Sequence, residues 1–352
     1  MQPIISGIQQ VGVGIPNVHE AWKWYREHFA MDIPVFEEAA VADLMLPYTG
    51  GSSHERHAIL ALSIQGGGGF EIWQYTSRTP EPSKFEYGVG DLGIYACKIK
   101  SRDINQSFEF MKSKNVLVSD RIETHIDGSR MFYVKDPYGN LFQLVESNDW
   151  FKKTNAGTGG AAGAVIGVTQ MDRSIKFYST ILGYDQIIAD EFGEFDDLKR
   201  LHHGNGKFRR VILGHSKPRT GGFSKLLGST QIELIQSLDR TPKHIFENRF
   251  WGDLGFIHLC FDIYHMSALK ERCEAEGHPF TVDSSNSFDM GEAAGHFSYI
   301  EDPDGTLIEF VETHKIPIVK KIGWYLDLRK RDPNKPLPNW MLRSLAFNRK
   351  KD

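Results

Sequence analysis

Hydrophobic and polar positions along the chain form short blocks that switch between the periods of a strand and a helix. Residues 8–15 alternate as in a half-buried strand, and residues 19–29 carry aromatic side chains at helical spacing. Two further apolar blocks, 59–64 and 70–75, indicate strands joined by the four glycines of 66–69. The pattern predicts a unit of one strand, one helix and about three strands.

The same succession of blocks recurs three more times. The predicted elements are 93–99, 104–114, 131–134 and 141–145 in the second unit, 165–169, 171–182, 210–214 and 231–236 in the third, and 256–263, 267–276 and the hairpin 297–312 in the fourth. A longer excursion at 189–223 interrupts the third unit. The small residues of Gly157–Gly163 are expected to form a flexible link between the halves of the chain.

Short sequence tags support a duplication. The turn DPYGN at Asp136–Asn140 returns as DPDGT at Asp302–Thr306, and GDLG at Gly90–Gly93 returns at Gly252–Gly255. Repeats in this order predict one half at residues 1–152 and a second at 153–315. Residues 316–352 fit no unit, and their basic and aromatic composition predicts a strap that packs back on the repeated units.

Composition narrows the class of protein. The 41 basic and 45 acidic residues give a net charge of −4, which argues against a general nucleic-acid binder. No apolar run approaches the roughly 18 residues that a membrane helix needs, and the first ten residues lack a signal-peptide pattern. The three cysteines, at 97, 260 and 273, are scattered, so we expect no disulfide framework and a cytoplasmic location.

Four βαβββ units with a DPxG hairpin in the second and fourth resemble the vicinal oxygen chelate superfamily, over about residues 4–315. That superfamily includes glyoxalase I, bleomycin-resistance proteins and extradiol dioxygenases. The resemblance implies an α+β fold in which four modules, in two paired halves, form half-open eight-stranded barrels. It also implies one divalent metal ion, Zn, Ni, Co, Mn or Fe(II), held by the first and last strands of the modules.

Strand alternation assigns two inward positions to each module. They are Gln10 and Glu71 in the first module, Ile94 and Gln143 in the second, Gly163 and Glu233 in the third, and His258 and Glu309 in the fourth. If modules one and four share a site, as in four-module glyoxalase I, the resemblance implies the metal ligands Gln10, Glu71, His258 and Glu309. If modules three and four share it, as in the dioxygenases, the set is Glu233, His258 and Glu309.

Further residues are predicted around this site. The resemblance implies that Glu309 is the catalytic base, and the hairpin is expected to place Ser298 opposite Glu309, with His296 on the same face as a proton shuttle or substrate donor. Trp73, Tyr75 and Ser298 are the predicted substrate-pocket residues. The histidine pairs His202–His203 and His54–His57 are expected in loops or lids, without partners at metal-ligand spacing.

The expected substrate class rests on three positions at which this sequence differs from glyoxalase I. Gly14, Tyr75 and Leu254 stand where that enzyme has Arg, Asn and Arg for glutathione. The resemblance therefore implies a glyoxalase-type isomerase, lyase or epimerase that transfers a proton next to a metal-bound oxygen of a small apolar or aromatic substrate other than a glutathione adduct. The alternatives are an Fe(II) extradiol-type or keto-acid dioxygenase and a metal-poor binding protein similar to the resistance proteins. Monomer and homodimer are both compatible with four modules in one chain.

Overall fold

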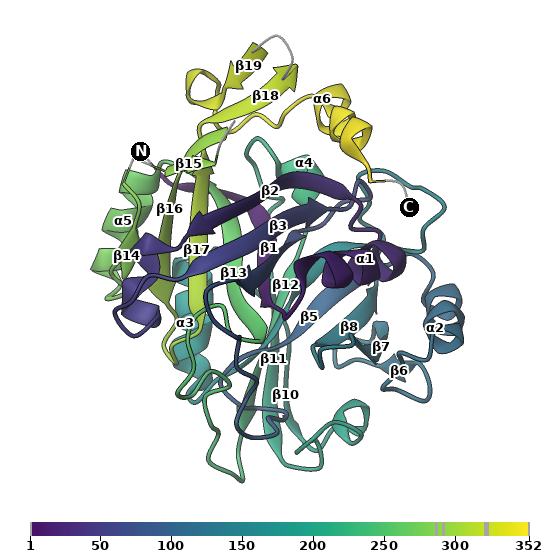
Figure 1. Cartoon of the computed structure of the whole chain (residues 1–352). Helices are drawn as coiled ribbons and strands as arrows, with labels where there is room; N and C mark the ends of the chain where they lie inside the picture. The colour runs from purple at the N-terminus through teal and green to yellow at the C-terminus, as the bar shows by residue number, and fades with distance from the viewer. Residues whose placement is uncertain (1, 286–287, 291–292, 320–323, 351–352) are drawn as a thin grey trace.

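The computed structural model describes residues 2–285, 288–290, 293–319 and 324–350, and it contains two large, strongly curved sheets (Figure 1). The first sheet has the strand order β14-β16-β17-β13-β1-β4-β3-β2, with β15 paired to β16. The second has the order β10-β11-β12-β9-β5-β8-β7-β6. The predicted α+β fold of four repeated modules and two eight-stranded half-barrels is confirmed.

The elements follow the predicted order. Module one contains β1 (Ile4–Gly14), α1 (Val18–Phe29), β2 (Ile33–Val41), η1 (Asp43–Tyr48), β3 (Glu55–Leu62) and β4 (Gly69–Tyr75). Module two contains β5 (Gly93–Ser101), α2 (Ile104–Ser113), β6 (Glu123–Thr124), β7 (Arg130–Lys135) and β8 (Leu141–Glu146).

Module three contains β9 (Thr158–Gly167), α3 (Met171–Thr180), β10 (Gln186–Gly193), η2 (Asp196–Leu198), β11 (Phe208–Gly214), α4 (Ser224–Leu227) and β12 (Gln231–Ser237). Module four contains β13 (Gly255–Tyr264), α5 (Met266–Ala275), β14 (Val282–Asp283), β15 (Phe288–Met290), β16 (Ala293–Glu301) and β17 (Leu307–Thr313). The tail adds β18 (Lys315–Val319), β19 (Trp324–Asp327), η4 (Leu328–Lys330), α6 (Asn339–Ser344) and η5 (Leu345–Asn348). In the described parts of the chain no helix is long and apolar enough to cross a membrane.

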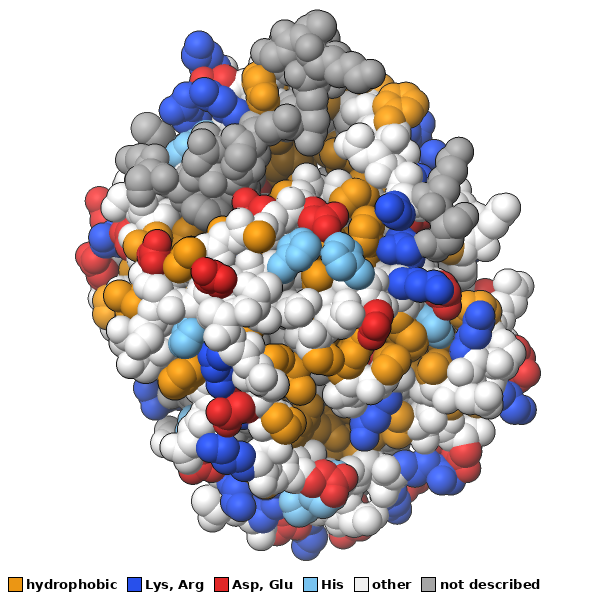
Figure 2. Space-filling view, in the orientation of Figure 1, with side chains coloured by type: hydrophobic (Ala, Val, Ile, Leu, Met, Phe, Trp, Pro, Cys, Tyr) orange, Lys and Arg blue, Asp and Glu red, His pale blue; other side chains and the backbone are white. Residues whose placement is uncertain are grey.

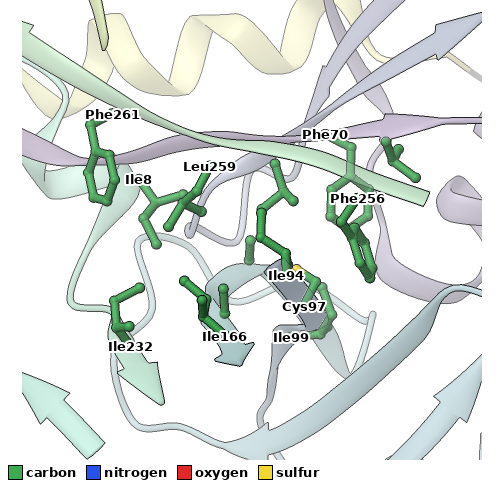
Figure 3. Close-up of a cluster of buried hydrophobic side chains, with 14 of the residues drawn as sticks. Ile8, Phe70, Ile94, Cys97, Ile99, Ile166, Ile232, Phe256, Leu259 and Phe261 are labelled. Atoms are coloured by element: carbon green, nitrogen blue, oxygen red, sulfur yellow. The ribbon is translucent and has the colours of Figure 1, made fainter. Parts of the chain in front are cut away.

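Each sheet combines one module from each half of the sequence. Strand β1 pairs antiparallel with β13 and parallel with β4, so modules one and four form the first sheet. Strand β9 pairs antiparallel with β5 and parallel with β12, so modules two and three form the second. The central strands of the two sheets pack against each other through a shared apolar core (Figure 3). The division of the chain at residues 152 and 315 stays a prediction.

The glycine-rich segment at 157–163 is not a flexible link, so that expectation is wrong. Most of it belongs to β9, a fully buried central strand of the second sheet. The backbone of Gly160 donates a 2.8 Å hydrogen bond to the carbonyl of Gly66, and a Cβ there would lie 2.5 Å from the carbonyl oxygen of Gly68. The small residues allow neighbouring backbone segments to approach closely, and they do not make this segment flexible.

The repeated DPxG turns join helices to sheets across module boundaries. The hydroxyl of Tyr25 in α1 donates a 2.7 Å hydrogen bond to Asp136, and the hydroxyl of Tyr178 in α3 donates a 2.9 Å bond to Asp302. Each aspartate also accepts backbone N–H bonds from its own turn, at 2.8–2.9 Å. The sheets therefore join modules one to four and two to three, whereas the tyrosine–aspartate bonds join one to two and three to four.

We expect Tyr178→Phe to lower the free energy of unfolding by about 1–2 kcal/mol, because the buried carboxyl of Asp302 loses a hydrogen-bond donor. Urea unfolding of the variant and the parent measures the difference. Tyr325→Phe, at a half-exposed tyrosine of the tail, is the control and should leave stability unchanged. Equal midpoints for Tyr178→Phe and the parent would show that the bond contributes nothing.

Candidate functional site

Four neighbouring strands of the first sheet direct polar side chains to one place on its concave face. Gly12 on β1 pairs with both Glu71 on β4 and His258 on β13. Cys260, two residues after His258, pairs with both Gln10 on β1 and Glu309 on β17. Because residues paired in register share a face of a sheet, these side chains all point to the concave face of the first sheet. We call this concave face the first cup, and the concave face of the second sheet the second cup.

The structure brings together all four residues of the first predicted ligand set. His258 Nε2 lies 3.1 Å from Glu309 Oε2 and 3.3 Å from Glu71 Oε2. Gln10 Nε2 lies 3.4 Å from Glu309 Oε2 and 3.5 Å from Glu71 Oε2. His258 is completely buried, and Gln10 is 4% exposed. One imidazole, two carboxylates and one amide thus converge in a site with little access to water.

The electrostatics of the group depend on the two carboxylates. Burial alone would lower the pKa of His258, but the charges and hydrogen bonding of Glu309 and Glu71 outweigh it and raise that pKa to about 9. Burial, reinforced by the same carboxylates, raises the pKa values of Cys260 and Tyr299 well above their ordinary values. Both groups therefore stay protonated at neutral pH.

The donor set fits a divalent metal ion. The ligand atoms of Glu71, His258 and Glu309 all lie within 4.8 Å of one another. Among the described residues, His258 Nε2 and Gln10 Oε1 are buried without a hydrogen bond of normal geometry. Carboxylate, amide and imidazole donors suit Zn, Ni, Co, Mn or Fe(II). A rotation of the Gln10 amide would turn its oxygen toward the position that Nε2 now occupies.

Gly12 makes room for the histidine. A Cβ at this position would lie 2.7 Å from both ring nitrogens of His258 and closer still to the carbon between them. Any side chain at residue 12 would therefore push the imidazole out of its place between the two carboxylates.

The predicted register of the β16–β17 hairpin is wrong by one residue. Tyr299, not Ser298, lies opposite Glu309, and His296 lies opposite Glu312. The turn contains five residues, from Asp302 to Thr306, because Gly305 adopts a left-handed conformation with φ of 84°. A shift of one residue moves every side chain of a strand to the other face of the sheet.

His296 and Ser298 consequently lie on the face of the sheet away from Glu309. His296 Nε2 is 2.6 Å from Asp283 Oδ1, and the hydroxyl of Ser298 is 3.3 Å from the sulfur of Met266 in α5. The residue that the sequence reasoning missed is Tyr299, whose hydroxyl lies 3.5 Å from His258 Nδ1. The five-residue turn DPDGT was the signal that could have identified it.

An aromatic cluster fills one end of the cup. Trp73 and Tyr75 follow Glu71 at alternate positions of β4, and their rings are 4.5 Å apart. The ring of Trp251 lies 4.7 Å from that of Trp73 and is stacked 6.3 Å from His258. A neighbouring cavity of about 460 Å³ is lined in part by Trp251 and Ile257. The role of Trp73 and Tyr75 as pocket residues stays a prediction.

A buried acid lies further along the same face of β13. Asp262 is completely buried and pairs with Gly7 and Val311. Burial raises its pKa to about 7; the hydroxyl of Ser6 partly offsets this effect, and the charge of Glu312 adds to it.

Glu233, the alternative ligand, lies in the second sheet and does not meet His258. Lys98 Nζ is 2.8 Å from its carboxylate, His125 Nε2 is 2.9 Å away, and Arg210 Nη2 is 2.6 Å away. Burial alone would raise the pKa of Glu233, but these three neighbours hold it well below its usual range. The second cup thus holds a buried ion-pair network built on Glu233.

A bulge at Tyr95 shifts the register of β5, so Ile94 and Lys98, which simple alternation would place on one face, lie on opposite faces. Ile94, the predicted inward residue, lies in the shared core between the sheets, and Lys98 points into the cup instead. Lys98 pairs with Gly163, as His258 pairs with Gly12 in the first cup. In each cup a nitrogen base thus pairs with a glycine of the neighbouring central strand, although only Gly12 lies against the ring of its partner.

Comparison with known proteins agrees with this architecture. The family model of the Glyoxalase/Bleomycin resistance protein/Dioxygenase superfamily matches residues 7–144 and 161–310. The chain therefore belongs to this superfamily. A search of curated proteins finds no match.

Two solved structures share the fold. Glyoxalase I from Zea mays is 15% identical, with a TM-score of 0.54, and the match covers 88% of this chain and 92% of that one. A candidate dioxygenase from Bacillus subtilis subsp. subtilis str. 168 is 13% identical, with a TM-score of 0.55, and the match covers 88% and 86% of the two chains.

We expect Gly12→Ala to lower the free energy of unfolding by about 1–3 kcal/mol, because the added methyl group collides with the His258 ring. In a His258→Ala background the same change should cost nothing, because the ring is absent. Urea unfolding of the parent, both single variants and the double variant measures this coupling. Additive effects would contradict the proposed steric conflict.

We expect Asp262→Asn to stabilise the protein at pH 8 by up to a few kcal/mol and to have less effect at pH 5. Because folding raises the pKa of Asp262, its contribution to the free energy of unfolding is fully present below the unfolded-state pKa near 4. This contribution is lost as the pH rises through the folded-state pKa of about 7. The amide cannot ionise, so it removes that loss. Thermal unfolding across this pH range is the measurement, and a pH-independent difference would contradict the expectation.

Proposed function

We propose that this protein is a metal-dependent enzyme of the glyoxalase type, an isomerase, lyase or epimerase that works by proton transfer. Gln10, Glu71, His258 and Glu309 would hold one divalent ion. The observation that carries the proposal is the convergence of these four donors, from four strands and both ends of the chain, with contacts of 3.1–3.5 Å.

The chemistry follows from the donor set. A divalent ion bound there supplies positive charge that stabilises negative charge developing on a substrate oxygen when a neighbouring C–H bond loses its proton. Glu309 is our candidate for the base that takes and returns this proton, and Glu71 is the second carboxylate within reach of the same place. Tyr299 would hold the other nitrogen of the His258 ring.

The surroundings support a small apolar or aromatic substrate. Trp73, Tyr75 and Trp251 line the cup next to the polar group. A glutathione adduct is disfavoured, because a Cβ at Gly14 would collide with the backbone of Asp253, which leaves no room for an arginine there. The hydroxyl of Tyr75 is already engaged by the carbonyl of Trp251.

A dioxygenase is the weaker alternative. Non-haem iron oxygenases use two histidines and one carboxylate, whereas the group in the first cup, among the described residues, has one histidine and two carboxylates. The other alternative is a metal-poor binding protein. In that case no ion should copurify with the protein, and a chelator should not change its properties.

We expect His258→Ala to lose the metal, and Glu309→Gln to keep most of it while losing at least a hundredfold in turnover. Metal content is measured by elemental analysis, and turnover with phenylglyoxal adducts of small thiols. Glu191→Gln, on the exposed strand β10, is the matched control and should behave like the parent. If both site variants bind metal and react like the parent, the assignment is wrong.

A further inference from the structure

A second group of metal-ligand atoms lies outside the cup. His57 Nε2 is 3.3 Å from Glu37 Oε1, and His19 Nε2 is 3.8 Å from the same oxygen. The ligand atoms of the three residues all lie within 4.8 Å of one another. Their side chains are 26%, 41% and 61% exposed for His57, Glu37 and His19, so water reaches the group.

The sheet fixes two of the three residues. Strands β2 and β3 are antiparallel, with Glu37 opposite Ile59 and Ala39 opposite His57. Glu37 and His57 are therefore diagonal neighbours on one face, at a spacing that long side chains bridge. This face is the one on which Ile59 packs in the shared core, so it is opposite to the face that carries Glu71.

The start of helix α1 places the third residue. Asn17 caps the helix by accepting hydrogen bonds from the backbone of His19 and Glu20, at 3.1 and 3.2 Å. Gln74 on β4, which pairs with His57, accepts a 2.9 Å bond from the backbone of Val18. These bonds anchor the first turn beside β3, and the rings of His19 and His57 are 5.2 Å apart.

We propose that His19, Glu37 and His57 form a peripheral binding site for a divalent transition metal ion, independent of the site in the cup. Ligands about 2.0–2.2 Å from one tetrahedral ion are about 3.3 Å apart, so the His57–Glu37 spacing already fits and His19 needs only a small adjustment. Water completes the coordination. Figure 2 shows neighbouring histidine side chains beside acidic groups on this exposed face.

The donor chemistry defines the class of ion. Two imidazoles and one carboxylate favour Zn²⁺, Ni²⁺, Co²⁺ or Cu²⁺ over Mg²⁺ and Ca²⁺, which prefer oxygen ligands. The expectation that His57 has no partner at ligand spacing is therefore wrong. Its partners come from α1 and from β2, and β2 is an outer strand that the apolar pattern does not predict.

Zinc titration of chelator-treated full-length protein tests the proposal. We expect the parent to bind two ions and His57→Gln to bind one, while His202→Gln, a matched change at an exposed histidine elsewhere, still binds two. His19→Gln should also lose the second ion, and circular dichroism confirms folding of each exposed-site variant. Equal stoichiometry in the parent and His57→Gln would overturn the proposal.

The double variant separates this site from the one in the cup. His258→Ala should retain one ion, and His57→Gln with His258→Ala should retain none. If the cup binds no metal, the parent binds one ion and His57→Gln binds none, so the peripheral site stands although the proposed function fails. If the ion is lost with His258→Ala but kept with His57→Gln, the reverse holds.

Discussion

The antiparallel pairing of β1 with β13 is the interaction on which the candidate site depends. It brings Gln10 within 3.4 Å of Glu309, although the two residues are 299 positions apart in the sequence. Without it, Gln10 with Glu71 and His258 with Glu309 would be two separate pairs, each too small to bind a metal tightly. A buried imidazole between two buried carboxylates is stable only when all three partners are present, so the strand pairing and the polar group support each other.

The two cups show how one architecture can hold positive charge in different ways. In the second cup the Lys98 ammonium lies against Glu233, and Arg210 links that carboxylate to Asp197. Each charge there has a partner within the chain, which makes the network a structural element. In the first cup, His258 is the single nitrogen base near two carboxylates, and its Nε2 has no well-formed hydrogen bond among the described residues. That difference points to the first cup as the one with a role for a bound ion.

Much of the fold could be predicted from the sequence, because central strands and helices carry strong apolar periodicity and the DPxG tags mark the hairpins. The four donors of the first cup could be predicted as well, since they follow from alternation within strands and from the resemblance. Local irregularities could not. The five-residue turn around Gly305 places Tyr299 in the cup and His296 outside it, and the bulge at Tyr95 turns Ile94 into the shared core while Lys98 stays in the second cup. The exposed outer strand β2 has a weak apolar pattern, so the position of Glu37 beside His57 could not be predicted.

The tail limits how the first cup can be reached. Leu328, Leu337 and Leu342 are buried against Leu62 and Tyr264, which lie on the concave face of the first sheet, beyond the polar group. The aromatic cluster around Trp73 fills the opposite end. The polar group therefore lies between two apolar ends, where charge interactions are stronger than in water because the local dielectric is low. Under the proposed function, a substrate that enters this cup would exchange water for aromatic surface, and this exchange would favour a small apolar molecule over a charged, peptide-like one.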